Sequence, residues 1–375
     1  MQAAIAAAER GASVLVFDKK ATIGAPVRCG EFLPCMEEML DLLPGSSDFT
    51  RLFEIPPDAI TNMCERLRIF SPRGKRWEFP FKAYVLDRLV LEQHMAKEAS
   101  ELGAEIRLGR PVRIFENDGH IKVGATEQES FEAQVVIAAD GFPSLAATSG
   151  GLSCDRYALP ENVAINYQYV MDGLNIESDV TEMYTGTSIA PGGYGWIIPK
   201  SSTTANIGVG IRTTFKSGKW RTLLDHFVHG YSLTADRLRS GRIQTMIADL
   251  LPVDGAVSKT YSDRILLVGD AAGMVIPTNG GGIPTAMVSG RIAGEVAALH
   301  VMKNEPLSSY ETRWRKAFGR ELFASTRMRR FADAFMPNDL LFDCAMRILG
   351  TAGIKKVLTC KIPSSIGPLM KLLGY

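Results

Sequence analysis

The stretch RILLVGDAAG, residues 264–273, decides the fold. The apolar run after its arginine is typical of a strand buried on both faces, and such strands form parallel sheets covered by helices. A glycine and Asp270 follow at the carboxyl end of the strand, where α/β sheets place ligand-binding groups. Two other apolar stretches share this design, because SVLVF is followed by Asp18 and QVVIAA by Asp140. The sequence therefore predicts an α/β domain with a ligand site at one edge of its sheet.

The N-terminal residues predict a helix that leads into the first of these strands. Ala3 to Glu9 form an alanine-rich helical stretch, and Gly11 supplies its C-terminal stop. Helix, strand and Asp18 in this order are the second half of a dinucleotide-binding unit, whose acid binds ribose hydroxyls about 20 residues after a GxGxxG turn. Counting back from Asp18 places this turn before Met1, so the sequence is either truncated or degenerate there. The intact pattern downstream favours truncation, and we expect the first strand and its glycines to be missing.

The rest of the chain divides into segments of different periodicity. Residues 86–102 form an amphipathic helix, strands follow at 105–108 and 112–115, and residues 160–250 alternate in the manner of an antiparallel sheet. From Gly290 onward the chain is helical in character, with breaks at prolines. We predict a discontinuous cofactor domain that consists of residues 1–50, 84–150 and 255–300. A substrate domain consists of residues 51–83 and 151–254, and residues 301–375 form a helical C-terminal region.

Charge and composition argue against several function classes. The 42 Lys plus Arg balance 41 Asp plus Glu to a net charge of +1, whereas nucleic-acid proteins usually carry excess basic charge. The six Cys include no CxxC pair and the five His show no metal-ligand spacing, so we expect no metal site and mostly reduced thiols in the cytoplasm. Cys35, Cys64 and Cys154 are interpreted as packing residues, and a bond between Cys344 and Cys360 is left open.

Membrane contact is expected at most at the surface. The N-terminus lacks the basic region of a signal peptide, and no apolar run reaches the roughly 18 residues that cross a bilayer. The tail KKVLTCKIPSSIGPLMKLLGY, residues 355–375, mixes Lys with Leu, Ile and Met, which suits a surface that touches lipid. A basic helix packed on the protein's own core would have the same composition.

Five motifs occur in an order seen in one group of flavoproteins. They are GAPVRCGE (24–31), YVLDR (84–88), AADG (138–141), GYGWIIP followed by GVG (193–210), and GDAAG with GGGIPTAMVSG (269–290). Over roughly residues 1–300 the chain resembles the geranylgeranyl reductase family of hydroxylase-like FAD enzymes, and most of all the archaeal branch acting on digeranylgeranylglycerophospholipids. The family motif YxWxFP appears here with Ile198 in place of Phe, which puts the preferred substrate chain length in doubt.

The resemblance implies a Rossmann-type FAD domain, an antiparallel-sheet substrate domain and a set of FAD-binding residues. A carboxylate at Asp270 can accept a hydrogen bond from a ribityl hydroxyl, although capping a helix is the alternative. Glycines before a helix at about 283–299 expose N–H groups to the anionic edge of a reduced flavin, and a flexible loop is the alternative. The implied FAD-binding residues are Asp18, Arg28, Cys29, Gly30, Arg88, Val112, Asp140, Gly269, Asp270, Gly281, Gly282 and Ile283.

Several of these residues have simpler interpretations that the sequence leaves open. Arg88, implied to pair with the pyrophosphate, could be a solvated arginine on a helix face. Asp140 and its glycine could serve only the turn after a strand. Cys29 could be a small buried hydrophobe.

The resemblance also implies a reaction, in which reduced FAD saturates isolated C=C bonds of a prenyl chain. Cys29, Tyr194 and Trp196 are the implied catalytic residues, the two aromatic ones lining an apolar site that stabilises developing positive charge; ordinary core packing is their alternative. The proton source is not assigned, and water near Cys29 and Glu31 is one option. The electron donor, NAD(P)H, a ferredoxin or another redox protein, is also left open.

Two other functions remain alternatives at this stage. An FAD-dependent aromatic monooxygenase shares the GDAA and AADG motifs, but RCGE and YxWxxP argue against it. A non-catalytic prenyl-lipid-binding remnant would be consistent with the absent phosphate-binding turn.

Overall fold

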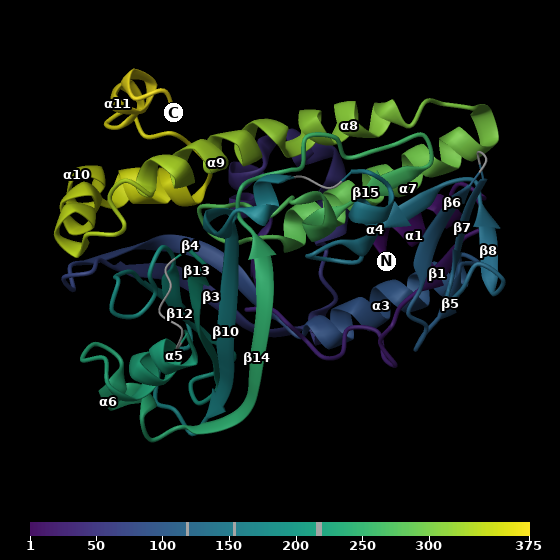
Figure 1. The fold of residues 1–375 in the computed structure, drawn as a ribbon. Helices are drawn as coiled ribbons and strands as arrows, with labels where there is room; N and C mark the ends of the chain where they lie inside the picture. Colours follow the sequence, from purple (N-terminus) through teal and green to yellow (C-terminus); the bar gives the residue numbers. More distant parts are fainter. Residues whose placement is uncertain (118–119, 153–154, 215–219) are drawn as a thin grey trace.

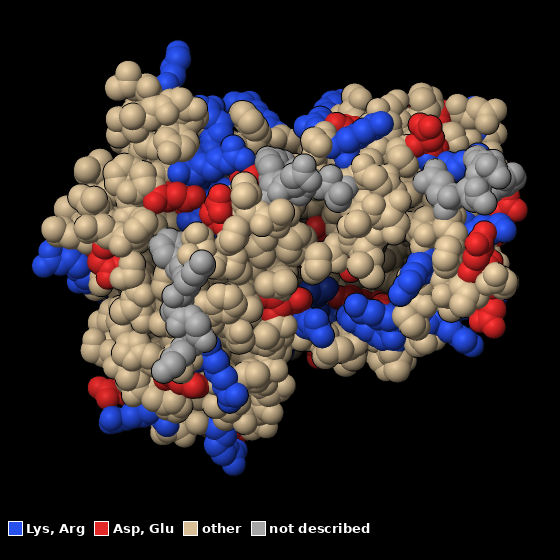
Figure 2. All heavy atoms as spheres, in the orientation of Figure 1, with Lys and Arg blue, Asp and Glu red and all other residues tan. Residues whose placement is uncertain are grey.

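A computed structural model describes residues 1–117, 120–152, 155–214 and 220–375. Figure 1 shows two lobes: one built around a large sheet, and one in which helices surround short parallel strands. Basic and acidic side chains are interspersed over the face seen in Figure 2, in keeping with the net charge of +1.

Within the described residues, two short parallel strand pairs and the long helices around them form the framework of the α/β lobe. Strand β1 (Leu15–Phe17) pairs with β5 (Glu105–Arg107), and β9 (Val136–Ala138) pairs with β15 (Ile265–Leu267). The helices are α1 (Gln2–Ala8), α3 (Arg88–Glu101) and α7 (Ile283–Lys303), and a small sheet is formed by β6 (Arg113–Asn117), β7 (His120–Gly124) and β8 (Ser130–Ala133). Helices α1 and α7 pack very closely, because a Cβ atom at Gly294 would lie 2.2 Å from the carbonyl oxygen of Ala3.

The second lobe is an eight-stranded sheet. Its strand order is β14-β10-β13-β12-β11-β3-β4-β2, and every neighbouring pair is antiparallel except β3 and β11. The strands are β2 (Phe32–Pro34), β3 (Ile60–Phe70), β4 (Arg76–Leu86), β10 (Val163–Asp172), β11 (Val180–Tyr184), β12 (Tyr194–Pro199), β13 (Ala205–Arg212) and β14 (Arg242–Pro252). Buried residues of α5 (Trp220–His229) form one core with this sheet, so the predicted antiparallel region is confirmed.

The C-terminal helices are shared between the two lobes. Tyr310 of α8 (Ser308–Trp314) donates a hydrogen bond of 2.6 Å to the carbonyl of Leu267, and both residues belong to the main core. In α10 (Asp339–Leu358), Met346 and Ile354 pack with Trp77 and other residues of the large sheet. The remaining helices are α2 (Met36–Leu42), α4 (Leu145–Ser149), α6 (Ala235–Leu238), α9 (Arg320–Ala332) and α11 (Gly367–Leu372). The predicted division into three parts remains a prediction, and residues of the C-terminal region contribute to both lobes.

Burial of the three predicted strands differs from strand to strand. Strand β15 is completely buried, whereas β1 is only half-buried and β9 buries only Ala138. The expectation of a fully buried strand is therefore wrong for β1 and β9. Each pairs with one neighbour within the described residues, which leaves its other edge without a covering strand.

Two further expectations can be compared with the structure. Cys344 and Cys360 are free thiols, the first exposed and the second buried, so the open question of a bond between them is answered in the negative. Cys154 lies outside the described residues. Among the helices of the described residues, none has the length and apolar character needed to cross a membrane.

Candidate functional site

Four segments that are distant in the sequence meet where the two lobes join. They are the loop of residues 28–31, strand β12, the residues before α7, and the 3-10 turn Gly269–Ala272 that follows β15. The Tyr194 hydroxyl of β12 donates a hydrogen bond to the carbonyl of Asn279, which ties the sheet to the loop before α7. A Cβ atom at Gly282 would lie 3.2 Å from the Asp270 Oδ1 atom, so the turn and the start of α7 are in contact.

Asp270 is a carboxylate whose oxygens are not bonded to the protein. Within the described residues, neither a hydrogen bond nor an ion pair reaches its side chain, so the capping alternative does not describe it. Burial raises the pKa of Asp270 to about 6; the Arg88 guanidinium lowers it, and the Asp249 carboxylate raises it further. The residue is only part-buried and its oxygens remain accessible, so they are free to accept hydrogen bonds from a ligand; ionisable groups with shifted pKa values gather at ligand sites.

Arg88 begins helix α3 and lies beside the loop of residues 28–31. Its guanidinium donates to Glu92, and its backbone N–H donates to Glu31 at 3.1 Å. Burial by itself lowers the pKa of Arg88, but the neighbouring Cys29 and Glu92 raise it overall. The Arg88 side chain is 31% exposed and lies near both Glu92 on its own helix and Cys29 in the loop, so its pairing with the pyrophosphate stays a prediction.

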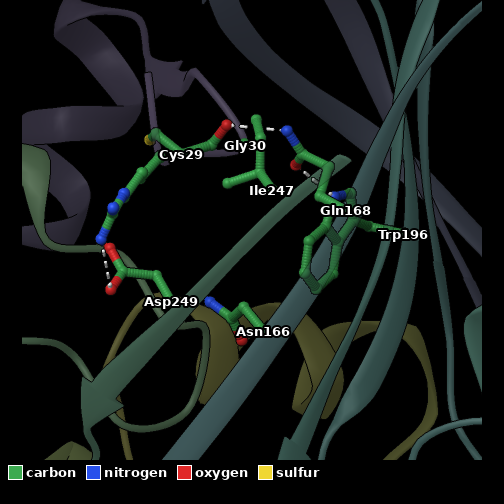
Figure 3. A pocket seen from close by; sticks show the side chains of 8 residues that line it. Cys29, Gly30, Asn166, Gln168, Trp196, Ile247 and Asp249 are labelled. Carbon is green, nitrogen blue, oxygen red and sulfur yellow. Dashed lines mark hydrogen bonds and ion pairs between the residues drawn. The ribbon is translucent and has the colours of Figure 1, made fainter. Parts of the chain in front are cut away.

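A small, partly open pocket lies between the loop and the sheet, as Figure 3 shows. Its lining residues are Arg28, Cys29, Gly30, Asn166, Gln168, Trp196, Ile247 and Asp249. Gln168 bridges the two walls: its Nε2 donates to the carbonyl of Cys29 at 2.9 Å, and its Oε1 accepts from the Trp196 indole at 3.1 Å. The RCGE and YxWxxP motifs are thus joined through one amide side chain.

Tyr194 and Trp196 form an aromatic wall at this site. Their rings meet edge to face, with centroids 5.9 Å apart and an interplanar angle of 62°. A Cβ atom at Gly208 would lie 2.2 Å from Cζ2 of Trp196, so the glycine of the GVG motif makes room for the indole on the neighbouring strand. Burial, together with the nearby Cys29 sulfur, raises the pKa of Tyr194 above its ordinary value. This phenol therefore stays protonated and donates.

Arg28, Cys29 and Gly30 are the predicted FAD-binding residues that line the pocket, and Asp18, Val112 and Asp140 are among those that do not. Asp18 follows β1, where its Oδ1 accepts from the N–H of Lys20 at 2.9 Å. The Arg110 N–H donates to the Asp18 carbonyl at 3.0 Å, which brings the segment leading to Val112 beside Asp18. Both Asp140 oxygens are engaged in their own loop, by the Ser144 hydroxyl at 2.7 Å and the Ala146 N–H at 3.1 Å. For Asp140 these contacts agree with the alternative of a turn residue.

The sequence interpretation missed the polar lining of the pocket. Asn166 and Gln168 on β10 and Asp249 on β14 were not singled out, although all three line it. A signal was present, because Asn166 and Gln168 are two residues apart in an otherwise largely apolar strand and therefore share one face. Polar side chains repeated on one buried face need partners, and this requirement indicates a lining position.

Among the described residues, no group of His, Cys, Asp or Glu is arranged to hold a metal ion.

Comparisons with known proteins identify the relatives of this chain. A digeranylgeranylglycerophospholipid reductase from Methanocaldococcus jannaschii is 33% identical over 350 residues, which cover 90% of this chain and 85% of that protein. The chain belongs to the geranylgeranyl reductase family. A second relative, digeranylgeranylglycerophospholipid reductase 2 from Methanopyrus kandleri, is 34% identical over 329 residues, 85% of this chain and 80% of that protein. The sequence pattern described as the geranylgeranyl reductase catalytic domain matches residues 162–248, which include the pocket-lining residues Asn166, Gln168, Trp196 and Ile247.

Solved structures agree with this membership. A geranylgeranyl bacteriochlorophyll reductase-like protein from Thermoplasma acidophilum has a TM-score of 0.84 and 27% identity, covering 99% of this chain and 96% of that chain. The flavin-dependent brominase Bmp2 has a TM-score of 0.67 and 16% identity over 99% of this chain and 94% of that one, and this likeness shows the fold alone. The predicted hydroxylase-like flavoprotein architecture is confirmed.

Proposed function

We propose that this protein is an FAD-dependent reductase that saturates C=C bonds in geranylgeranyl chains of membrane lipid precursors such as digeranylgeranylglycerophospholipid. The observation that carries the proposal is the identity of 33% to a reductase of that name along 85% of its length. The proposal is supported by the pocket at the lobe junction, which is lined by Trp196 and by residues of the RCGE loop.

The residues at the junction fit a flavin dinucleotide. The Asp270 carboxylate has no partner within the described residues and can accept hydrogen bonds from sugar-like hydroxyls. The residues before Ile283 are glycines, so the N–H groups that open α7 can approach a ligand, and the helix dipole favours negative charge there. Arg88, held between Glu92 and the Cys29 loop, provides positive charge at the same junction. Asp18, with the neighbouring segment at Val112, is proposed to contact the adenosine part.

The chain's own side chains have distinct proposed roles in the reaction. Each C=C bond takes up one hydride and one proton: reduced FAD, when bound, would supply the hydride, and water near Cys29 and Glu31 would supply the proton. Tyr194 and Trp196 exclude water from the alkene and stabilise positive charge that develops on it through their ring faces. Gln168 holds Trp196 and the Cys29 carbonyl in a fixed relation, so that the aromatic wall and the RCGE loop keep their spacing. Cys29 is proposed to lie at the reacting centre.

Flavin titration tests the proposed cofactor site. In the purified protein, Asp270→Ala should weaken FAD binding roughly tenfold or more, since a hydrogen bond to a charged group contributes about 1.5–3 kcal/mol. The matched control is Asp236→Ala, which removes a carboxylate that is 84% exposed on α6 and should leave the affinity unchanged. Equal FAD affinity in the parent and Asp270→Ala would contradict the proposed site.

The C-terminal tail is proposed to touch the membrane that holds the substrate. Leucines of α10 and α11 are exposed there, with Leu341 at 50% and Leu372 at 82%, and exposed Lys371 lies beside Leu372. Apolar side chains with neighbouring lysines favour the surface of an anionic bilayer. We expect Leu372→Glu to reduce co-flotation with vesicles of anionic lipid, whereas Leu145→Glu, at a 70% exposed position on α4, should not. Equal flotation of parent and Leu372→Glu would contradict this contact.

A further inference from the structure

The RCGE loop is held in an unusual backbone conformation at Glu31. Its φ angle is +62°, in the left-handed region that residues with a side chain rarely adopt. In this conformation the Glu31 N–H donates to the Cys29 sulfur at 3.2 Å. Residues in such conformations persist only where the surroundings fix them. The contacts around Glu31 should therefore show what fixes the loop.

The Glu31 carboxylate is buried and bonded on both oxygens. Only 4% of the residue is exposed. One oxygen accepts the Arg88 N–H at the start of α3. The other accepts the Lys200 ammonium at 2.6 Å and the Asn206 amide at 2.9 Å. One carboxylate thus connects the loop to a helix of the α/β lobe, to strand β13 of the large sheet and to Lys200, the residue that follows β12.

Three carbonyls of the loop accept hydrogen bonds as well. The Cys29 carbonyl accepts from Gln168 at 2.9 Å, and the Gly30 carbonyl accepts from Asn206 at 3.1 Å. The Glu31 carbonyl accepts from the Leu86 N–H at 2.7 Å. Three consecutive peptide groups are therefore fixed to three different strands.

The Asn206 side chain shows that this arrangement serves the loop. Its amide nitrogen donates twice to the loop, while its own Oδ1 atom is buried with no hydrogen-bond partner within the described residues. An unpaired buried acceptor is costly. The two hydrogen bonds to the loop thus fix the orientation of Asn206, even though they leave its Oδ1 atom without a partner.

We propose that Glu31, clamped by Lys200 and Asn206, is a positioning residue that holds the Cys29 sulfur and the adjoining carbonyls in place for the proposed flavin site. The role of the loop at a flavin rests on the proposed function, whereas the clamp itself can be tested without flavin. The charge on Lys200 matters because its Nζ atom, at the end of a side chain that is 21% exposed, is the cation that neutralises the buried carboxylate.

Alkylation of individual cysteines tests the clamp. The probe is iodoacetamide, and the rate at each cysteine is followed by peptide mass spectrometry in the parent, Glu31→Gln and Lys200→Met. Loss of the charged pair should release the loop and accelerate alkylation of Cys29 roughly tenfold, the factor that corresponds to about 1.4 kcal/mol. Lys200→Arg retains the charge and should restore the slow rate.

Internal references separate a local effect from general loosening. Exposed Cys344 should react equally in all variants, and buried Cys360 should stay protected. The matched control Lys75→Met, at an exposed lysine in the turn between β3 and β4, should leave Cys29 unchanged. An unchanged Cys29 rate in both Glu31→Gln and Lys200→Met would overturn the proposal. Equal acceleration at Cys360 would also overturn it, by showing that the pair supports the whole fold.

Flavin spectroscopy distinguishes this proposal from the proposed function. In flavin-loaded protein, Lys200→Met should shift the absorption band of the bound oxidised flavin, because the loop carbonyls beside it move. A released Cys29 in a protein that binds no flavin would support the clamp and contradict the cofactor site. A bound flavin with an unaltered band and an unaltered Cys29 rate would support the cofactor site and contradict the clamp.

Discussion

Replacing Asp270 with Asn should stabilise the flavin-free protein near neutral pH. The pKa of Asp270 is raised from 3.8 to about 6 in the folded chain, chiefly by burial. A difference of about two pKa units corresponds to roughly 3 kcal/mol. Because the folded pKa is the higher one, the folded protein binds more protons between these values, and stability falls as pH rises from about 4 to about 6. Because Asn cannot ionise, Asp270→Asn should avoid this loss of stability.

The assay is urea unfolding of the flavin-free protein at pH 4 and pH 7.5. We expect Asp270→Asn to raise the free energy of unfolding at pH 7.5 by up to about 3 kcal/mol more than it does at pH 4. The control is Asp87→Asn. Asp87 caps α3 by accepting a hydrogen bond from the Val90 N–H at 3.1 Å, and Asn caps a helix equally well. We therefore expect its free energy of unfolding to change by no more than about 0.5 kcal/mol at either pH. An Asp270→Asn effect independent of pH, or a loss of stability at pH 7.5, would refute the reasoning.

Three further substitutions probe the packing around the site. Gly294→Val should lower the free energy of unfolding, measured in urea, by about 3 kcal/mol, because the valine side chain has no room against α1. A decrease below about 1 kcal/mol would contradict that packing. Gly208→Ala should displace the Trp196 ring, shift the tryptophan fluorescence and lower turnover about tenfold, whereas an unaltered emission spectrum would argue against the contact. Tyr194→Phe removes the hydrogen bond to Asn279 and should weaken FAD binding about fivefold, as measured by titration; unchanged affinity would show that this bond does not shape the loop.

The sequence was most informative where short segments carry the geometry themselves. A buried strand followed by Gly269 and Asp270, and glycines directly before a helix, predict a carboxylate beside a helix N-terminus, and the structure places Asp270 next to Gly282. Cys29 and Trp196 were also expected at one site, and both line the pocket.

The sequence was least informative where a contact depends on strand register. Gln168 and Cys29 are 139 residues apart, and Lys200 and Glu31 are 169 apart, so only the order and register of the large sheet bring them together. Local patterns cannot supply that register. The role of Asp140 was ambiguous for a different reason, since a turn and a ligand site use the same residue types at the end of a strand.

The central claim is tested most directly by the mass of the product. Flavin-loaded protein, reduced chemically and without oxygen, is incubated with digeranylgeranylglycerophospholipid, and the lipid is examined by mass spectrometry. The account predicts a gain of one H₂ for each bond saturated and no gain in protein without flavin. A lipid of unchanged mass, although flavin is bound and reduced, would contradict the account.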